Sequence, residues 1–345
     1  MKYQLYTTSQ KAWNGMFKAM AKAEKSIYLE MYILASDTGR THDFFSLLRD
    51  KVRDGVEVVI IADAYGSSAL KSDVVKDLRD AGVEFIFFSH WLKRTHRKIL
   101  IVDNRIAFLG GVNIEEKIRN WKDVQIRVVG GVVKPILKSF ANSYRRCGGK
   151  RESILRFSYT PLSRKIRYWV MDNWPGTNKP YSLNTYYRQK IAEAKSLIQI
   201  VTPYLLPPRW LLAALDDACR RGLLVEIIIP KDTDVSSLNK INFLNAYRLS
   251  QMGVKFFVTP TMNHAKLMLV DNEEVVIGSQ NIDILSFGVN FEAGIFSRQQ
   301  NLVADLKKII NDWKKEAEPL STEEARAGLG SRFLFHIYKF FYPIF

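Results

Sequence analysis

The sequence contains one uncommon pattern twice, with the same internal spacing in both copies. The pattern is H-x-K, four residues, D, six residues, and then G-[GS]-x-N. The copies are His96-Arg97-Lys98, Asp103 and Gly110-Gly111-Val112-Asn113, then His264-Ala265-Lys266, Asp271 and Gly278-Ser279-Gln280-Asn281. Because chance matches do not preserve every interval, the repeat predicts two related halves that share one function.

Other landmarks repeat at nearly the same offset as the motifs. They include residues 53–61 and 221–229, each with a glycine before a β-branched run, and residues 81–85 and 252–256. Helices that alternate with short apolar strands predict an α/β fold with largely buried sheets. We expect residues 1–150 to form an N-terminal half with the first motif, 151–320 a connector and C-terminal half with the second, and 321–345 a separate tail.

Each motif also predicts a local shape. The apolar stretches after Lys98 and Lys266 are typical of strands, and the pairs Asp103-Asn104 and Asp271-Asn272 are typical of turns. In the resulting hairpin the histidine and lysine lie two residues apart on one face, so both can point at one ligand. The two aspartates start the turns, and we expect them to fix the turn or a neighbouring backbone segment rather than bind a ligand.

The motif residues are those needed to hold and attack a phosphate ester. One imidazole can attack phosphorus and form a phosphohistidine, while the other protonates the leaving alkoxide and later deprotonates the incoming alcohol or water. Lysine and asparagine side chains can bind the non-bridging oxygens as negative charge grows. The catalytic candidates are His96, Lys98, Asn113, His264, Lys266 and Asn281. The motifs hold no acidic cluster, so we expect no metal and no cofactor.

Two carboxylates follow the histidines at nearly equal distances. Asp123 lies 27 residues after His96, and Glu292 lies 28 residues after His264. A carboxylate beside each ring would orient it and stabilise its cation, although both could instead be ordinary surface acids. Tyr32 and Tyr204 end matching apolar runs in the two halves and are candidate substrate-binding residues.

The composition points to an anionic partner. The formal net charge is +16 and the pI is about 9.6, which suits nucleic acid or an acidic membrane surface without choosing between them. Cys147 and Cys219 form no disulfide framework, as in proteins of a reducing compartment. The sequence contains no run of about 18 apolar residues, so it predicts no membrane-spanning helix.

At its two motifs the chain resembles the phospholipase D superfamily, and within it the bacterial cardiolipin synthases. The resemblance covers about residues 15–315. It extends to three further stretches. Thr202–Pro207 is similar to T-P-Y-F-x-P, Trp121–Asp123 to W-R-D, and Ser286–Glu292 to S-F-x-L-N-F-E. One departure is Leu285, which stands where the synthases usually carry the arginine of D-x-R-S, and this puts the acceptor alcohol in question.

The resemblance implies both a fold and a reaction. The fold would be two α/β/α sandwich halves related by a pseudo-twofold axis, with the active site at their interface. His96 would be the nucleophile and His264 the general acid and base. The reaction would transfer a phosphatidyl group from one phosphatidylglycerol to another and release glycerol.

The C-terminal tail predicts a route to lipid. Its aromatic residues alternate with cations, among them Arg332, Phe333, Lys339 and Phe340, as in a helix that lies in a membrane interface. A helix docked on the protein's own core is the alternative. The connector adds further basic residues that can bind anionic lipid: Arg145, Arg146, Lys150, Arg151, Arg164, Lys165 and Arg167. The tail and these residues together predict a peripheral protein on the cytoplasmic side of the cell membrane.

Three other functions use the same sequence features. A lipid hydrolase would use water as the acceptor, and a metal-independent endonuclease would use nucleic acid, which the tail and the lipid-branch segments disfavour. A non-enzymatic lipid-binding protein would not need two complete motifs. The sequence leaves open the acyl-chain preference and the oligomeric state.

Overall fold

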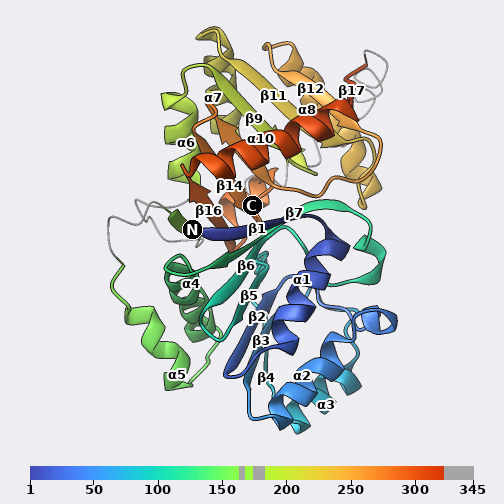
Figure 1. The fold of residues 1–345 in the computed structure, drawn as a ribbon. Helices are drawn as coiled ribbons and strands as arrows, with labels where there is room; N and C mark the ends of the chain where they lie inside the picture. Colours follow the sequence, from blue (N-terminus) through green and yellow to red (C-terminus); the bar gives the residue numbers. More distant parts are fainter. Residues whose placement is uncertain (163–167, 174–182, 322–345) are drawn as a thin grey trace. The chain divides into compact units, whose positions relative to one another are not determined.

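A computed structural model describes residues 1–162, 168–173 and 183–321 of the chain (Figure 1). The chain divides into two compact units. The first consists of Met1–Asp172 and the short segment Phe291–Ile295, and the second consists of Asn173–Asn290 and the chain from Phe296 onward. Residues 291–295 therefore follow the second motif in sequence but belong to the unit of the first.

The first unit is built on a seven-stranded sheet of order β1-β7-β6-β5-β2-β3-β4. Strands β2, β3 and β4 are parallel, and the remaining pairs are antiparallel. The strands are β1 (Lys2–Thr8), β2 (Ser26–Met31), β3 (Glu57–Asp63), β4 (Glu84–Phe88), β5 (Ile99–Val102), β6 (Ile106–Gly110) and β7 (Lys122–Val129).

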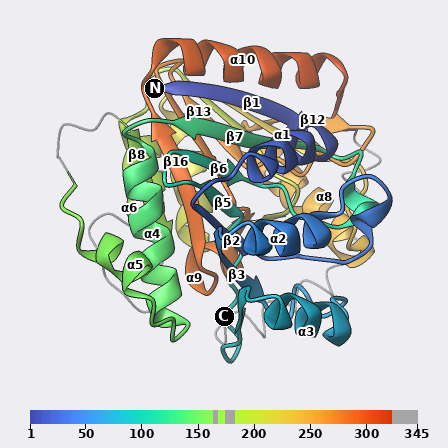
Figure 2. The same cartoon turned by 60° about the horizontal axis from the view of Figure 1, so that its bottom comes forward.

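Helices cover both faces of this sheet (Figure 2). Alternate residues of β2 divide between the faces, because successive side chains of a strand point in opposite directions. Ile27, Leu29 and Met31 pack in one core with the first three helices, whereas the Tyr28 ring stacks on Phe140 of the fourth, with centroids 5.4 Å apart. The helices are α1 (Ser9–Ala21), α2 (Phe44–Arg53), α3 (Ser72–Asp80), α4 (Val133–Arg146) and the short α5 (Glu152–Leu155).

A second sheet has eight strands in the order β17-β12-β11-β9-β13-β14-β16-β8, and most of it belongs to the second unit. Strands β8 and β16 are the exceptions, because residues 168–172 and 292–295 are grouped with the first unit. The strands of this sheet are β8 (Tyr168–Asn173), β9 (Leu197–Val201), β11 (Leu224–Pro230), β12 (Lys255–Thr259), β13 (Leu267–Val270), β14 (Glu274–Gly278), β16 (Glu292–Ser297) and β17 (Glu318–Pro319). A two-stranded pair joins β10 (Leu205–Leu206) to β15 (Ile282–Asp283). The helices are α6 (Leu183–Glu193), α7 (Arg209–Arg220), α8 (Ser236–Ser250), α9 (Ile284–Gly288) and α10 (Gln300–Lys315).

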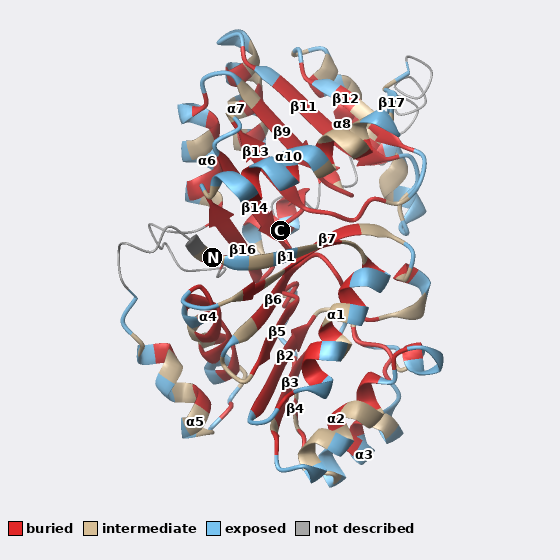
Figure 3. Cartoon of the chain, viewed as in Figure 1, coloured by how far each residue is buried: buried red, intermediate tan, exposed pale blue. Residues whose placement is uncertain are grey.

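The two sheets repeat one topology. The order β7-β6-β5-β2-β3-β4 in the first corresponds to β16-β14-β13-β9-β11-β12 in the second. The central strands are buried along their whole length, as the red strands of Figure 3 show. Gly55 and Gly222 have φ values of 82° and 85° in the matching turns between a helix and the next strand, where a side chain would be strained. The prediction of an α/β fold made of two related halves is confirmed.

Candidate active site

The two motifs form nearly identical β-hairpins. The turn residues Asp103 and Asn104 have φ values of 52° and 56°, and Asp271 and Asn272 have values of 52° and 55°. A two-residue hairpin turn of this kind requires positive φ at both central positions, which Asp and Asn tolerate better than other side chains. The strands that the turns join place each histidine just before β5 or β13.

The turn aspartates bind backbone rather than pointing at the histidines. The Asp103 carboxylate accepts hydrogen bonds of 2.7–3.1 Å from the N–H groups of Glu24, Lys25 and Ser26. In the second hairpin Asp271 accepts equivalent bonds of 2.8–3.0 Å from three backbone N–H groups, those of Lys195, Ser196 and Leu197. Each aspartate therefore ties its hairpin to the start of the neighbouring strand, β2 or β9.

Both motif lysines are buried and fold back on their own histidines. The ammonium group of Lys98 donates to the backbone carbonyl of His96 at 2.5 Å, and Lys266 donates in the same way to His264. All four residues are buried, with at most 6% of their surface exposed. A cation that carries a strong donor is thus held beside each histidine, out of contact with bulk water.

His96 is bound by a carboxylate from a distant part of the chain. Its Nδ1 lies 3.0 and 3.1 Å from the two carboxylate oxygens of Glu292, which is completely buried. The backbone fixes this contact, because the N–H of His96 donates to the Phe291 carbonyl at 2.9 Å and the N–H of Phe291 donates to Arg94 at 2.8 Å. The sequence offsets associate Glu292 with His264, whereas its carboxylate binds the histidine of the other motif.

Tyrosines pack against both histidine rings. The Tyr32 ring meets His96 edge to face, with centroids 4.8 Å apart, and the Lys98 ammonium lies 4.9 Å from the Tyr32 centroid. Burial raises the pKa of Tyr32, so its hydroxyl stays protonated at neutral pH. In the second unit Tyr204 lies edge to face with His264 at 6.4 Å, and its hydroxyl donates to Asp234.

The motif asparagines are buried in different surroundings. Asn113 Oδ1 accepts a hydrogen bond of 3.2 Å from the N–H of Ile33, next to Tyr32 in sequence. The N–H of Asn281 donates to the Ser286 hydroxyl at 3.2 Å. The Oδ1 atom of Asn281 is buried and has no hydrogen-bond partner within the described parts of the chain.

Asp123 is also completely buried, at the start of β7. Its Oδ1 accepts a hydrogen bond of 2.7 Å from the N–H of Val124. A Cβ atom placed on Gly111 would lie 2.2 Å from the same oxygen, so the first motif needs glycine there. The second motif has Ser279 at that position.

Comparison with known proteins identifies the family. Residues 16–129 and 187–313 match the family described as "Cardiolipin synthase, PLD-like domain". The chain belongs to the phospholipase D superfamily, in its cardiolipin synthase branch.

Relatives in this branch resemble the chain over most of its length. It is 29% identical to the cardiolipin synthase of Oceanobacillus iheyensis, over 99% of this chain and 74% of that protein. It is 31% identical to the cardiolipin synthase of Clostridium perfringens, over 88% of this chain and 70% of that one. The crystal structure of phosphatidylserine synthase from Haemophilus influenzae has the same fold, with a TM-score of 0.78, 15% identity and coverage of 98% and 93% of the two chains.

This chain departs from the D-x-R-S pattern of the cardiolipin synthases at one position, where Leu285 stands in place of the arginine. Asp283 is the N-cap residue of α9 and accepts a hydrogen bond of 2.6 Å from the N–H of Ser286. Leu285 lies between them in sequence and is 39% exposed. The leucine therefore replaces a cation without disturbing the cap of the helix.

Sequence reasoning missed a buried ionic network that involves both sequence neighbours of His96, Thr95 and Arg97. Arg97, which is completely buried, lies 3.5 Å from Glu30 and 3.7 Å from Asp172, and it donates to the Ser139 hydroxyl. Glu30 also accepts a hydrogen bond of 2.7 Å from the hydroxyl of Thr95. The signal lay in the variable position of H-x-K, which is Arg97 in one motif and Ala265 in the other.

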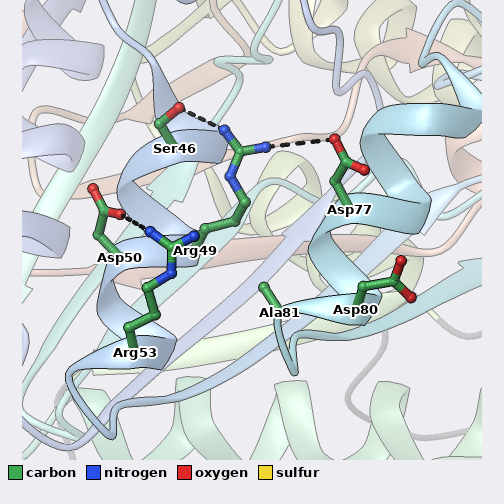
Figure 4. A pocket seen from close by; sticks show the side chains of 7 residues that line it. All are labelled: Ser46, Arg49, Asp50, Arg53, Asp77, Asp80 and Ala81. Atoms are coloured by element: carbon green, nitrogen blue, oxygen red, sulfur yellow. Dashed lines mark hydrogen bonds and ion pairs between the residues drawn. The ribbon is translucent and has the colours of Figure 1, made fainter.

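A separate cavity of about 700 Å³ lies between α2 and α3 (Figure 4). Its charged groups largely pair with one another. Arg49 binds the Ser46 hydroxyl at 2.7 Å and lies 3.9 Å from Asp77, and Arg53 lies 3.2 Å from Asp50. No motif residue lines this cavity, so we do not assign the reaction to it.

Several predicted lipid contacts lie outside the described residues. These are Arg332, Phe333, Lys339 and Phe340 of the tail, and Arg164, Lys165 and Arg167 of the connector. Of the connector cations that are described, Arg151 pairs with Glu84 and lies 3.6 Å from Glu57. Within residues 1–162, 168–173 and 183–321, no helix is long and apolar enough to cross a membrane.

Proposed function

We propose that this chain is a phosphatidyltransferase of the cardiolipin synthase type, which joins two phosphatidylglycerol molecules and releases glycerol. The observation that carries the assignment is the contact between His96 Nδ1 and the buried Glu292 carboxylate. In a neutral imidazole, a ring nitrogen that donates to a carboxylate leaves the opposite nitrogen, Nε2, unprotonated. The Glu292 contact therefore favours the tautomer of His96 that a nucleophile toward phosphorus needs.

In the first half of the reaction, His96 Nε2 attacks the phosphorus of one phosphatidylglycerol. The P–O bond to the headgroup glycerol breaks, and His264 gives its proton to the departing alkoxide, so that glycerol leaves as a neutral alcohol. Glu292 stabilises the positive charge that the His96 ring gains as it forms the phosphohistidine.

In the second half, His264 removes a proton from the headgroup hydroxyl of a second phosphatidylglycerol. The oxygen attacks the phosphohistidine, the P–N bond breaks, and cardiolipin forms with His96 restored. Lys98 and Lys266 are proposed to neutralise the non-bridging oxygens, and the amides of Asn113 and Asn281 to bind them, as charge grows in each transition state. Tyr32 and Tyr204 are proposed to border the phosphate.

Buried lysines make electrostatic sense in such a site. A buried ammonium group costs free energy when no anion is near, and a phosphodiester supplies one. Asp123 is proposed as a second orienting carboxylate, and Asp103 and Asp271 as support for the hairpins. This division of roles uses every motif residue without a metal ion, so transfer is expected to continue in the presence of a chelator.

We further propose that the protein acts at the cytoplasmic face of the cell membrane as a peripheral protein. The net charge of +16 favours an anionic surface, and the tail, residues 321–345, has the composition of an interfacial helix. Deletion of residues 328–345 is expected to weaken binding to anionic liposomes while the fold persists.

The test of the reaction is product analysis with phosphatidylglycerol vesicles and a chelator. Cardiolipin and glycerol in equal amounts are expected. Phosphatidic acid alone would mean that water is the acceptor, and plasmid cleavage without lipid turnover would mean a nuclease.

The roles of the histidines have a separate test. With headgroup-phosphate-labelled phosphatidylglycerol, His264→Ala is expected to accumulate label on His96, and His96→Ala to accumulate none. Label on His264 in the His96→Ala protein would reverse the assignment.

A further inference from the structure

An exposed apolar turn lies a few residues before His96. His90-Trp91-Leu92-Lys93 form a β-turn, in which the N–H of Lys93 donates to the His90 carbonyl at 3.3 Å. Trp91 is 84% exposed and Leu92 is 38% exposed, so both central side chains project into solvent. Large apolar side chains at a turn tip are unusual, because turns favour small polar residues.

The backbone of this turn is strained by its own sequence. Leu92 has a φ of 57°, in the left-handed region that glycine or asparagine normally occupies at this position of a turn. Leucine there costs free energy that glycine would not. Such outliers cluster at functional sites, where the side chain is kept despite the strain.

Two cations, Lys93 and Arg94, directly follow the apolar pair of the turn. The sequence between Glu84 and Asp103 contains no Asp or Glu. Arg94 ties the turn to a second exposed aromatic residue, Tyr65, which is 67% exposed. The Arg94 guanidinium lies 4.5 Å from the centre of the Tyr65 ring and donates to the backbone carbonyls of His90 and Lys93.

The turn is also rigidly joined to the nucleophile. His96 follows Leu92 by four positions, so at most about 14 Å of extended chain joins them. The Arg94 carbonyl accepts the N–H of Phe291, and the Phe291 carbonyl accepts the N–H of His96. Whatever the turn tip binds is therefore held near the residue that we propose attacks phosphorus.

We propose that Tyr65, Trp91 and Leu92, with Lys93 and Arg94, form a membrane-docking tip that inserts into the interface of an anionic bilayer. Tryptophan and tyrosine favour the level of the lipid headgroups, and neighbouring lysine and arginine bind their phosphates. The acid-free segment gives the tip charge complementarity to such a surface. This inference rests on the proposed lipid function, and it adds the place where the first unit meets the membrane.

The test uses the full-length chain and vesicles of phosphatidylglycerol or of phosphatidylcholine. Trp91→Ser with Leu92→Ser is expected to weaken binding to phosphatidylglycerol vesicles by about tenfold, and Lys93→Gln alone by about fivefold. The matched control is Leu224→Ser with Val235→Ser, because these residues are 39% and 41% exposed and lie outside the connector. Equal weakening by the control pair would overturn the proposal.

Two measurements separate docking from other roles. Trp91 emission should shift to shorter wavelength on phosphatidylglycerol vesicles, a change that the Trp91→Phe protein lacks; an unshifted emission would contradict insertion. Leu92→Gly should keep the turn, since glycine adopts the same φ without strain, and still weaken vesicle binding. Undiminished binding of this variant would contradict a role for the leucine side chain.

Turnover distinguishes the tip from the reaction itself. The serine pair should lose activity on vesicles and keep activity on short-chain phosphatidylglycerol below its micelle concentration. Loss on both substrates would make the turn part of the active site, and a changed oligomeric state would make it a contact between copies. If the unaltered protein turned over neither lipid, the proposed function would fail, while the vesicle-binding result would still decide the docking proposal.

Discussion

The Glu292 carboxylate lies 3.0 Å from Nδ1 of His96, although 196 residues separate the two in sequence. Phe291–Ile295 is grouped with the first unit, while the residues on either side of this segment belong to the second. A carboxylate that follows the second motif in sequence therefore contacts the histidine of the first.

Replacement of Glu292 by glutamine should lower kcat by about 10²-fold to 10⁴-fold. The neutral amide does not enforce the tautomer with an unprotonated Nε2 and does not stabilise the cation of the ring. Steady-state kinetics on phosphatidylglycerol would measure the loss, and thermal unfolding would check the fold. Glu24→Gln, at an exposed position, is the matched control and should retain full activity. A Glu292→Gln protein with kcat within twofold of the original would contradict the role of the contact.

Arg97 should matter for stability far more than an exposed arginine. Its replacement by alanine leaves Glu30 buried without its cation, and a loss of about 3–5 kcal/mol in the free energy of unfolding is expected. In the second unit the equivalent positions are apolar. Val201 corresponds to Glu30: Glu30 lies opposite Ile99 and Val201 lies opposite Leu267, each three positions after its motif histidine. Ala265 corresponds to Arg97.

The second unit therefore supplies a matched double variant, Glu30→Val with Arg97→Ala. Its loss in free energy of unfolding should be smaller than the sum of the losses of the two single variants, because neither charge of the pair remains buried alone. Denaturant unfolding of all three variants measures this coupling. Arg53→Ala, which breaks only the exposed pair with Asp50, should cost at most about 1 kcal/mol. Purely additive losses would show that Glu30 and Arg97 do not interact.

The repeat and the hairpins were predictable from sequence because they depend on local rules. The spacing of each motif reflects a strand, a turn that needs positive φ, and a returning strand, and Asp103 and Asp271 mark those turns. The repeated order of strands followed from the repeated landmarks. These features involve neighbouring residues, so a periodic pattern can record them.

The contacts of the site were less accessible to sequence reasoning. The nearly equal offsets of Asp123 and Glu292 pointed to carboxylates with a common role. They could not show that Glu292 binds His96, because that contact depends on residues 291–295 packing with the first unit. The pairing of Arg97 with Glu30 depends on side chains brought together by the sheet. The strained φ of Leu92 was equally hidden, since nothing in Trp91-Leu92 indicates a turn.

Asp271→Asn should destabilise the second hairpin by about 1–3 kcal/mol at pH 7. One of the two carboxylate oxygens becomes an amide nitrogen that cannot accept a backbone N–H, and the negative charge is lost. Burial acts to raise the pKa of Asp271, but hydrogen bonds from Leu197, Lys195 and Ser196 together outweigh it and hold the pKa below its usual value. The stabilisation is then complete above the unfolded-state pKa of about 3.9 and is lost as pH falls through the folded-state value.

The difference in unfolding free energy between the original protein and Asp271→Asn should accordingly be constant from pH 7 to about 5 and shrink below about pH 4. Denaturant titrations across this range measure it. Asp312→Asn, which alters only an exposed ion pair with Lys315, is the control and should show a small difference throughout. A difference that grew toward acid pH would contradict the sign of the shift.

His42 should make the first unit less stable in mild acid. The ring is 7% exposed and packs near Phe17 and Phe44, with centroids 5.6 and 5.8 Å away, while Asn14 Oδ1 lies 2.7 Å from its Nε2. Burial, and then the nearby Arg119 cation, lower the pKa of His42, so folding favours the neutral ring. That stability is present above the unfolded-state pKa of about 6.5 and is lost as pH falls through the folded-state value.

The free energy of unfolding should thus fall as the pH is lowered from 8 to 5.5. The free energy of unfolding of the His42→Phe protein should fall less over the same interval, because phenylalanine does not titrate. Denaturant unfolding at both pH values measures the difference. Leu48→Ala is the control in the same core, and it should lower stability equally at both pH values because it leaves the imidazole and the rings that contact it in place. If His42→Phe and the original protein lost the same stability on acidification, groups other than His42 would account for the acid sensitivity.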